Sequence, residues 1–167
     1  MSNRIYNVLF ICSGNSARSI MAEAILNDRG HDRFKAYSAG SRPRGEVEPV
    51  VLELLGSLGF DTSGLRSKSW HEFAVADAPQ MDFIFTVCDR AAGEQCPIWP
   101  GQPISGHWSF PDPVQAAVTP EEKSDALKHI LLQISNQIRL LLSLPIDELD
   151  EISLHSVVRE LCETKME

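Results

Sequence analysis

The sequence predicts an α/β domain built on a four-stranded parallel sheet with helices on both faces. Two observations lead to this prediction. Apolar runs of strand length, rich in β-branched and aromatic residues, alternate along the chain with amphipathic helical patterns. The expected strands are residues 5–11, 34–39, 81–87 and a weaker segment around Ile104. The first of them is nearly all apolar, as is typical of a strand buried on both faces.

Three helices are expected between and after these strands. Residues 20–25 carry apolar side chains at helical spacing directly after the first strand. Residues 47–58 follow the second strand, with Pro49 near the start, where proline is tolerated. Residues 127–141 give the cleanest amphipathic pattern in the chain, and Pro145 ends it.

The chain is expected to divide into a core domain, residues 1–145, and a C-terminal helical tail, residues 146–167. At 167 residues it is long enough to bury a core without disulfides or metals. The tail alternates apolar with acidic residues, which indicates one or two short amphipathic helices. Such a tail is expected to fold back on its own domain, and a homodimer contact is the alternative.

Composition excludes some classes of partner. The chain has 15 Lys and Arg against 23 Asp and Glu, a net charge of −8, so no nucleic-acid partner is expected. We find no signal peptide and no membrane-spanning run, and we expect a cytoplasmic protein. In such a chain, the four cysteines are expected to be reactive thiols rather than a disulfide framework.

The junction between the first strand and the first helix is typical of a loop that binds a tetrahedral oxyanion. Backbone N–H groups and the positive end of a helix dipole meet at such a junction, and both favour an anion. The residues expected to surround the ion are Ser13, Gly14, Asn15, Ser16, Ala17, Arg18 and Ser19, directly after Cys12.

Each residue type in this loop has a physical role. Cys12 would hold its sulfur as a thiolate among the N–H donors and act as a nucleophile. Gly14 and Asn15 can turn the backbone through positive φ, and Arg18 can bind two oxygens of the ion with its planar fork of donors. Ser19 can donate its hydroxyl to the sulfur. The alternative is a buried structural cysteine with an unrelated arginine downstream.

Beyond this loop, the chain resembles the low-molecular-weight protein tyrosine phosphatases and the arsenate reductases built on the same fold. Further motifs occur in the order expected of the arsenate reductase branch, from about residue 5 to about residue 142. They are Tyr37-Ser38-Ala39-Gly40, Asp61-Thr62-Ser63, Ser67-Lys68, Phe85-Thr86-Val87-Cys88-Asp89, Cys96-Pro97 and Asp112-Pro113.

The resemblance implies a strand order of 2-1-3-4, which brings Cys88 to the same edge of the sheet as Cys12. Taken alone, Cys88 has three interpretations: a small buried residue at the end of a strand, a zinc ligand, or a redox thiol. Its separation from Cys96 does not fit the usual short-spaced zinc pair. Beside a nucleophilic Cys12, a relay in which Cys88 and then Cys96 take over the disulfide is favoured. Cys162, in the tail, is assigned no chemistry.

The resemblance also assigns Asp112 as a general acid. By sequence alone an Asp-Pro pair indicates a turn or a helix start. No metal and no bound cofactor are expected, and Lys68 stands where some members of the family have an acidic residue, which argues against a cation there. An external thiol reductant, thioredoxin or glutathione with glutaredoxin, would restore the thiols.

Two other functions use the same loop. A protein tyrosine phosphatase needs only Cys12, Arg18 and Asp112, and phosphate and arsenate are nearly identical ions. An oxyanion sensor needs still fewer of these residues. The pair of Cys88 and Cys96 therefore favours arsenate reduction over both alternatives.

Overall fold

The computed structural model describes residues 4–88, 99, 103–111 and 119–163. Four parallel strands form one sheet: β1 (Tyr6–Cys12), β2 (Phe34–Gly40), β3 (Phe83–Thr86) and β4 (Ile104–His107). Their order is β2-β1-β3-β4, as predicted. The central position of β1 explains its sequence, because Val8 to Ile11 are fully buried.

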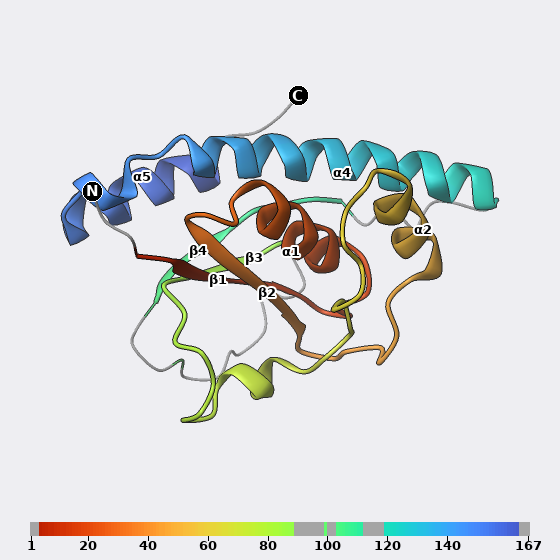
Figure 1. Cartoon of the computed structure of the whole chain (residues 1–167), viewed down its shortest axis with the longest axis horizontal. Helices are drawn as coiled ribbons and strands as arrows, with labels where there is room; N and C mark the ends of the chain where they lie inside the picture. Colours follow the sequence, from red (N-terminus) through yellow and green to blue (C-terminus); the bar gives the residue numbers. More distant parts are fainter. Residues whose placement is uncertain (1–3, 89–98, 100–102, 112–118, 164–167) are drawn as a thin grey trace.

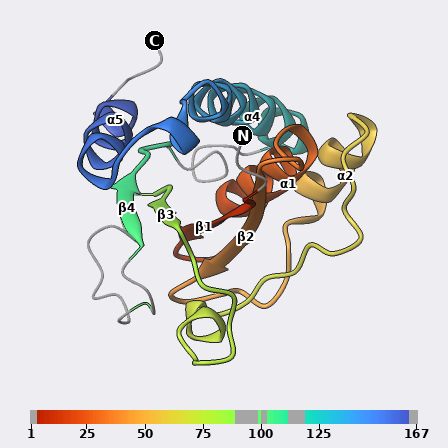
Figure 2. The ribbon, with the colours of Figure 1, turned by 60° about the vertical axis from the view of Figure 1, so that its left-hand side comes forward.

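Helices cover both faces of the sheet, but unequally (Figures 1 and 2). One face carries α1 (Arg18–Arg29), α2 (Pro49–Ser57), α4 (Pro120–Leu142) and α5 (Glu151–Glu163). On the other face, the described residues contribute the short 3-10 helix η1 (Trp70–Phe73), whose Phe73 packs against Tyr37 of β2. The α1 helix packs on β1 and β2, and the loop of residues 13–17 joins the end of β1 to its first turn.

The apolar patterns predicted the positions of the helices more accurately than the residues at which the helices begin. The last long helix was expected from residue 127, but α4 begins at Pro120. Its first two turns are mostly polar and contain no buried residue, so apolar spacing does not detect them. The true start is marked by a cap instead: the Thr119 hydroxyl accepts the backbone N–H of Glu122, and Pro120 follows the capping residue.

The tail folds back on its own chain. After the 3-10 helix η2 (Ile146–Glu148), α5 packs on β4 and α4 and buries Val158 and Leu161. The thiol of Cys162 lies against Gly106 of β4, where a larger residue would collide with the sulfur. A homodimer stays a prediction.

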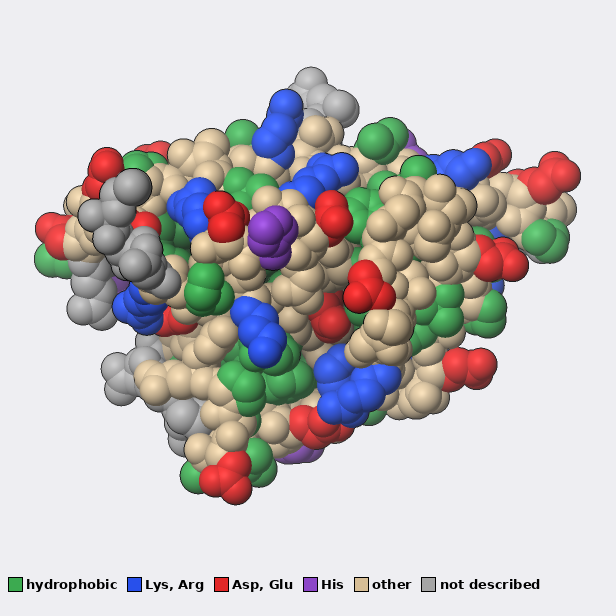
Figure 3. Space-filling model, in the orientation of Figure 1, with side chains coloured by type: hydrophobic (Ala, Val, Ile, Leu, Met, Phe, Trp, Pro, Cys, Tyr) green, Lys and Arg blue, Asp and Glu red, His purple; other side chains and the backbone are tan. Residues whose placement is uncertain are grey.

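On the face drawn in Figure 3, acidic and basic side chains are interspersed with apolar ones. Among the described helices, none is both long and apolar enough to span a membrane.

Candidate active site

The loop between β1 and α1 is held from outside by the segment that follows β2. Three of its carbonyl oxygens accept backbone N–H groups from that segment. The pairs are Arg42 to Ser13 at 2.9 Å, Arg44 to Gly14 at 3.0 Å and Glu48 to Ser16 at 3.0 Å. In a trans peptide the C=O and the following N–H point in opposite directions, so the amides of residues 14, 15 and 17 face away from this clamp, into the loop.

The first turn of α1 adds further donors. Ala17 precedes the helix and no side chain caps its N-terminus. The first N–H groups of a helix have no partner within the helix, and its dipole is positive at this end. Loop and helix together form a concave set of donors suited to an oxyanion.

Gly40, at the end of β2, allows the loop to sit this close to the sheet. A Cβ at this position would lie 2.5 Å from the Ser13 carbonyl oxygen, 2.9 Å from that of Cys12 and 3.0 Å from Cβ of Asn15. Two of these contacts are with backbone atoms that cannot rotate away. The glycine of the Tyr37-Ser38-Ala39-Gly40 motif is therefore required by the loop rather than by the strand.

Asn15 fixes the turn of the loop. It is fully buried, with a φ of 44°, and is the described residue other than glycine that takes a positive φ. Its side-chain oxygen accepts the backbone N–H of Lys68 at 2.8 Å, while its amide donates to the Ser19 hydroxyl at 2.8 Å. Both ends of the amide are thus bonded, which stabilises the left-handed conformation.

The sulfur of Cys12 lies at the bottom of this arrangement and is almost fully buried. It is 3.0 Å from the Ser19 hydroxyl oxygen. That oxygen accepts a hydrogen bond from Asn15, and its own hydrogen can be donated to the sulfur. A hydroxyl that donates to sulfur favours the thiolate, the nucleophilic form of cysteine.

Cys88 follows β3 and lies beside the loop. β3 pairs with β1 in register, with Thr86 opposite Ile11, so the two strands end at the same edge of the sheet. The backbone N–H of Ser13 donates to the Cys88 sulfur at 3.3 Å. The Cys88 thiol, itself buried, is therefore in contact with the residue that follows Cys12.

Arg18 joins the loop to the segment that leads toward Asp112. One terminal nitrogen of its guanidinium donates to the carbonyl oxygen of Phe110 at 2.8 Å. Arg18 therefore fixes the chain two residues before Asp112. Asp112 and Cys96 themselves lie outside the described residues.

A buried ion pair between Lys68 and Glu23 lies next to the loop, to which the backbone of Lys68 is bonded. The Lys68 ammonium lies 3.8 Å from a carboxylate oxygen of Glu23 on α1, which also accepts the Ser38 hydroxyl at 2.7 Å. Burial raises the pKa of Glu23. The hydrogen bond from Ser38 and the positive charge of Lys68 lower it, but by less. Burial likewise lowers the pKa of Lys68, opposed by Glu23.

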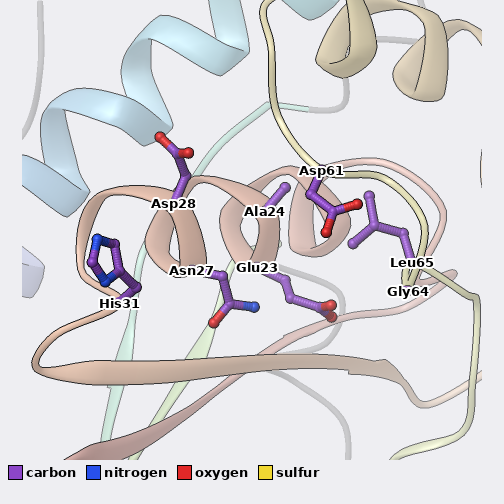
Figure 4. A pocket seen from close by; sticks show the side chains of 8 residues that line it. All are labelled: Glu23, Ala24, Asn27, Asp28, His31, Asp61, Gly64 and Leu65. Atoms are coloured by element: carbon purple, nitrogen blue, oxygen red, sulfur yellow. The ribbon is translucent and has the colours of Figure 1, made fainter.

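Figure 4 shows the pocket that opens onto Glu23, where Glu23 and Asn27 point from α1 toward β2. Of its lining residues, Glu23 is the one that belongs to the ion pair. In the described part of the chain, no group of three or more His, Cys, Asp and Glu is suited to hold a metal ion. The pocket has a volume of about 300 Å³ and lies beside the ion pair.

Sequence reasoning missed the residues that clamp and support the loop. Ser38, Gly40 and Lys68 belong to motifs that carried the resemblance, but no role was assigned to them. Arg42 and Arg44 belong to no motif. Their contacts join segments 15 to 53 residues apart in the chain, and local spacing gives no signal for such pairs.

Comparison with known proteins gives a family match for this chain. Residues 7–152 match the family described as low molecular weight phosphotyrosine protein phosphatase. An arsenate reductase of Shouchella clausii is 33% identical over 139 residues, which are 83% of this chain and 95% of that protein.

Solved structures agree with this match. A thioredoxin-dependent arsenate reductase of Corynebacterium glutamicum is 26% identical with a TM-score of 0.61, covering 85% of this chain and 62% of that one. This chain thus spans a little under two thirds of that protein. An arsenate reductase in the phosphate binding state is 27% identical with a TM-score of 0.60, covering 80% of this chain and 97% of that one.

Proposed function

Because the chain belongs to the low molecular weight phosphotyrosine protein phosphatase family, we propose that it is an arsenate reductase built on the phosphatase loop. Two findings support this choice within the family. The relative from Shouchella clausii, matched over most of both chains, is an arsenate reductase. A second thiol, that of Cys88, lies beside the oxyanion loop, where hydrolysis of a phosphate ester has no use for it.

The first step is nucleophilic attack by Cys12 on arsenate. The amides of the loop and the guanidinium of Arg18 bind the arsenate oxygens, and the Cys12 thiolate attacks arsenic. A sulfur–arsenic bond forms and one oxygen leaves as water, with Asp112 as the proton donor. Arsenic is still As(V) in this adduct.

Cys88 then carries out the reduction. Its thiolate attacks the sulfur of Cys12, a disulfide forms between Cys12 and Cys88, and the electron pair of the sulfur–arsenic bond passes to arsenic. Arsenic leaves as As(III) in arsenite, and two thiols have supplied the two electrons. The contact between the Ser13 amide and the Cys88 sulfur, 3.3 Å long, is the observation on which this step depends.

Cys96 completes the relay. It attacks Cys88, releases the Cys12 thiolate and leaves a disulfide between Cys88 and Cys96. A dithiol protein of the thioredoxin type, or glutathione with glutaredoxin, reduces this bond. The similar structure from Corynebacterium glutamicum is described as a thioredoxin-dependent arsenate reductase, which favours thioredoxin as the reductant. A reducing compartment, the cytoplasm, suits this chemistry.

Activity assays test this proposal. Purified protein is given arsenate with a thioredoxin system and with a glutathione and glutaredoxin system, and p-nitrophenyl phosphate hydrolysis is measured in parallel. We expect arsenite to form with at least one reductant. Cys88→Ser should abolish arsenite formation and retain hydrolysis, which needs only Cys12, Arg18 and Asp112. Hydrolysis without any arsenate turnover would establish the phosphatase alternative instead.

A further inference from the structure

The segment that follows β2 and bonds to the loop of Cys12 places two arginines beside that loop. Arg42 and Arg44 bond to the loop through their backbone N–H groups, at 2.9 Å to Ser13 and 3.0 Å to Gly14. Pro43 stands between them and restricts the backbone there. Their backbones are therefore fixed to the loop, while their side chains are exposed to solvent.

Arg44 also lies against the loop with its side chain. A Cβ at position 14 would be 3.3 Å from Nε and 3.5 Å from Cγ of Arg44. The guanidinium group thus begins directly beside Gly14, whose own amide is one of those that face into the loop. Glycine at position 14 provides the space that this side chain occupies.

The charge of these two side chains is available to a ligand. Neither Arg42 nor Arg44 forms an ion pair with any carboxylate of the described residues. The chain as a whole carries a net charge of −8, which repels an approaching dianion. A local pair of positive charges beside the loop opposes that repulsion.

We propose that Arg44, assisted by Arg42, attracts doubly charged tetrahedral oxyanions into the loop of Cys12 and raises their affinity. The inference rests on the proposed function for the identity of the physiological ion, but it applies to phosphate as well as arsenate. Neither arginine touches the reacting atoms; each acts through its charge on the approach and binding of the ion.

The expected magnitude follows from Coulomb's law. For an assumed separation of about 8 Å in water, one charge acting on a dianion changes binding by about fivefold at low ionic strength. The Debye length falls to about 3 Å at 1 M salt, so most of this effect should disappear there. A purely structural role for Arg44 would show no such dependence on salt.

The experiment compares Arg44→Gln with Arg44→Lys, which keeps the charge, and with Arg29→Gln as the matched control. Arg29 is the exposed last residue of α1, and its helix separates it from the loop by about 16 Å at 1.5 Å per residue. The dissociation constant of inorganic phosphate is measured by calorimetry on each reduced protein at low and high salt. Phosphate binds without turnover, so this readout is valid even if arsenate reduction fails.

We expect Arg44→Gln to raise the phosphate dissociation constant about fivefold at low salt and less than twofold at 1 M salt. Arg44→Lys and Arg29→Gln should stay near wild type. In arsenate turnover, Arg44→Gln should raise KM and leave kcat unchanged. An unchanged phosphate affinity, an equal loss at both salt concentrations, or an effect only on the KM for the protein reductant would each overturn the proposal.

Discussion

Replacing Gly40 with alanine should displace the oxyanion loop, because the added methyl group has no space. It would lie 2.5 Å and 2.9 Å from two backbone oxygens of the loop and 3.0 Å from Asn15. Real Cβ contacts are not this short, so the loop must move by several tenths of an ångström. Overpacking of this kind costs about 1–3 kcal/mol, and with backbone on both sides we expect the upper half of that range.

The assay separates stability from binding. Urea unfolding gives the free energy of unfolding, and calorimetry gives the phosphate dissociation constant, which should rise at least about tenfold when the amides are misplaced, a loss of about 1.4 kcal/mol. Gly56→Ala is the control, because a Cβ there meets nothing within 4 Å and the residue lies in α2. Alanine in a helix should stabilise the protein by about 0.5–1 kcal/mol. Wild-type stability and phosphate affinity in Gly40→Ala would refute the reasoning.

Three further predictions concern single contacts. Ser19→Ala removes the hydroxyl 3.0 Å from the Cys12 sulfur, and alkylation of Cys12 by iodoacetamide at neutral pH should slow by at least about tenfold, because a bond to a charged group is worth about 1.5–3 kcal/mol; an unchanged rate would show that this bond does not activate the sulfur. Burial raises the pKa of Glu23 above 4.5, so the folded protein holds that proton more tightly than the unfolded chain. The stability of wild type relative to Glu23→Gln should therefore fall as the pH rises above 4.5 and level off beyond the raised pKa, and a flat difference across this range would contradict the assignment. Gly106→Ala places a methyl group on the Cys162 sulfur and should destabilise the protein by about 1–3 kcal/mol; adding Cys162→Ala should restore most of the loss, and no rescue would show that another contact is responsible.

The sequence predicted those features that depend on local pattern. The apolar run into Cys12, the Gly14-Asn15 turn and the helical spacing after Arg18 were enough to place a loop between β1 and α1. Asn15, rather than Gly14, then takes the positive φ, because both ends of its side chain find partners in the fold. The Gly14-Asn15 motif identified the residues that can adopt a positive φ. Tertiary hydrogen bonds then determine that Asn15 is the one that does so.

Apart from Cys88, whose place beside Cys12 was predicted and is confirmed, the residues that meet the loop from distant segments were not predicted. Glu23 on α1 and Lys68 before η1 form a buried pair only because the sheet brings their segments together. The contact between Ser13 and Cys88 likewise depends on the pairing of β3 with β1. The resemblance supplied that strand order, and no periodicity in the chain contains it.

The most direct test of the relay is a variant that can form the first disulfide, between Cys12 and Cys88, but not the second, between Cys88 and Cys96. In Cys96→Ser, a single turnover with arsenate and no reductant should yield about one equivalent of arsenite and a disulfide between Cys12 and Cys88. Peptide mass mapping under non-reducing conditions identifies the linked peptides, with Cys162→Ala as the control for unrelated oxidation. We predict that the peptides of Cys12 and Cys88 are joined. Arsenite formation with both thiols still reduced, or a disulfide that omits Cys88, would contradict the mechanism.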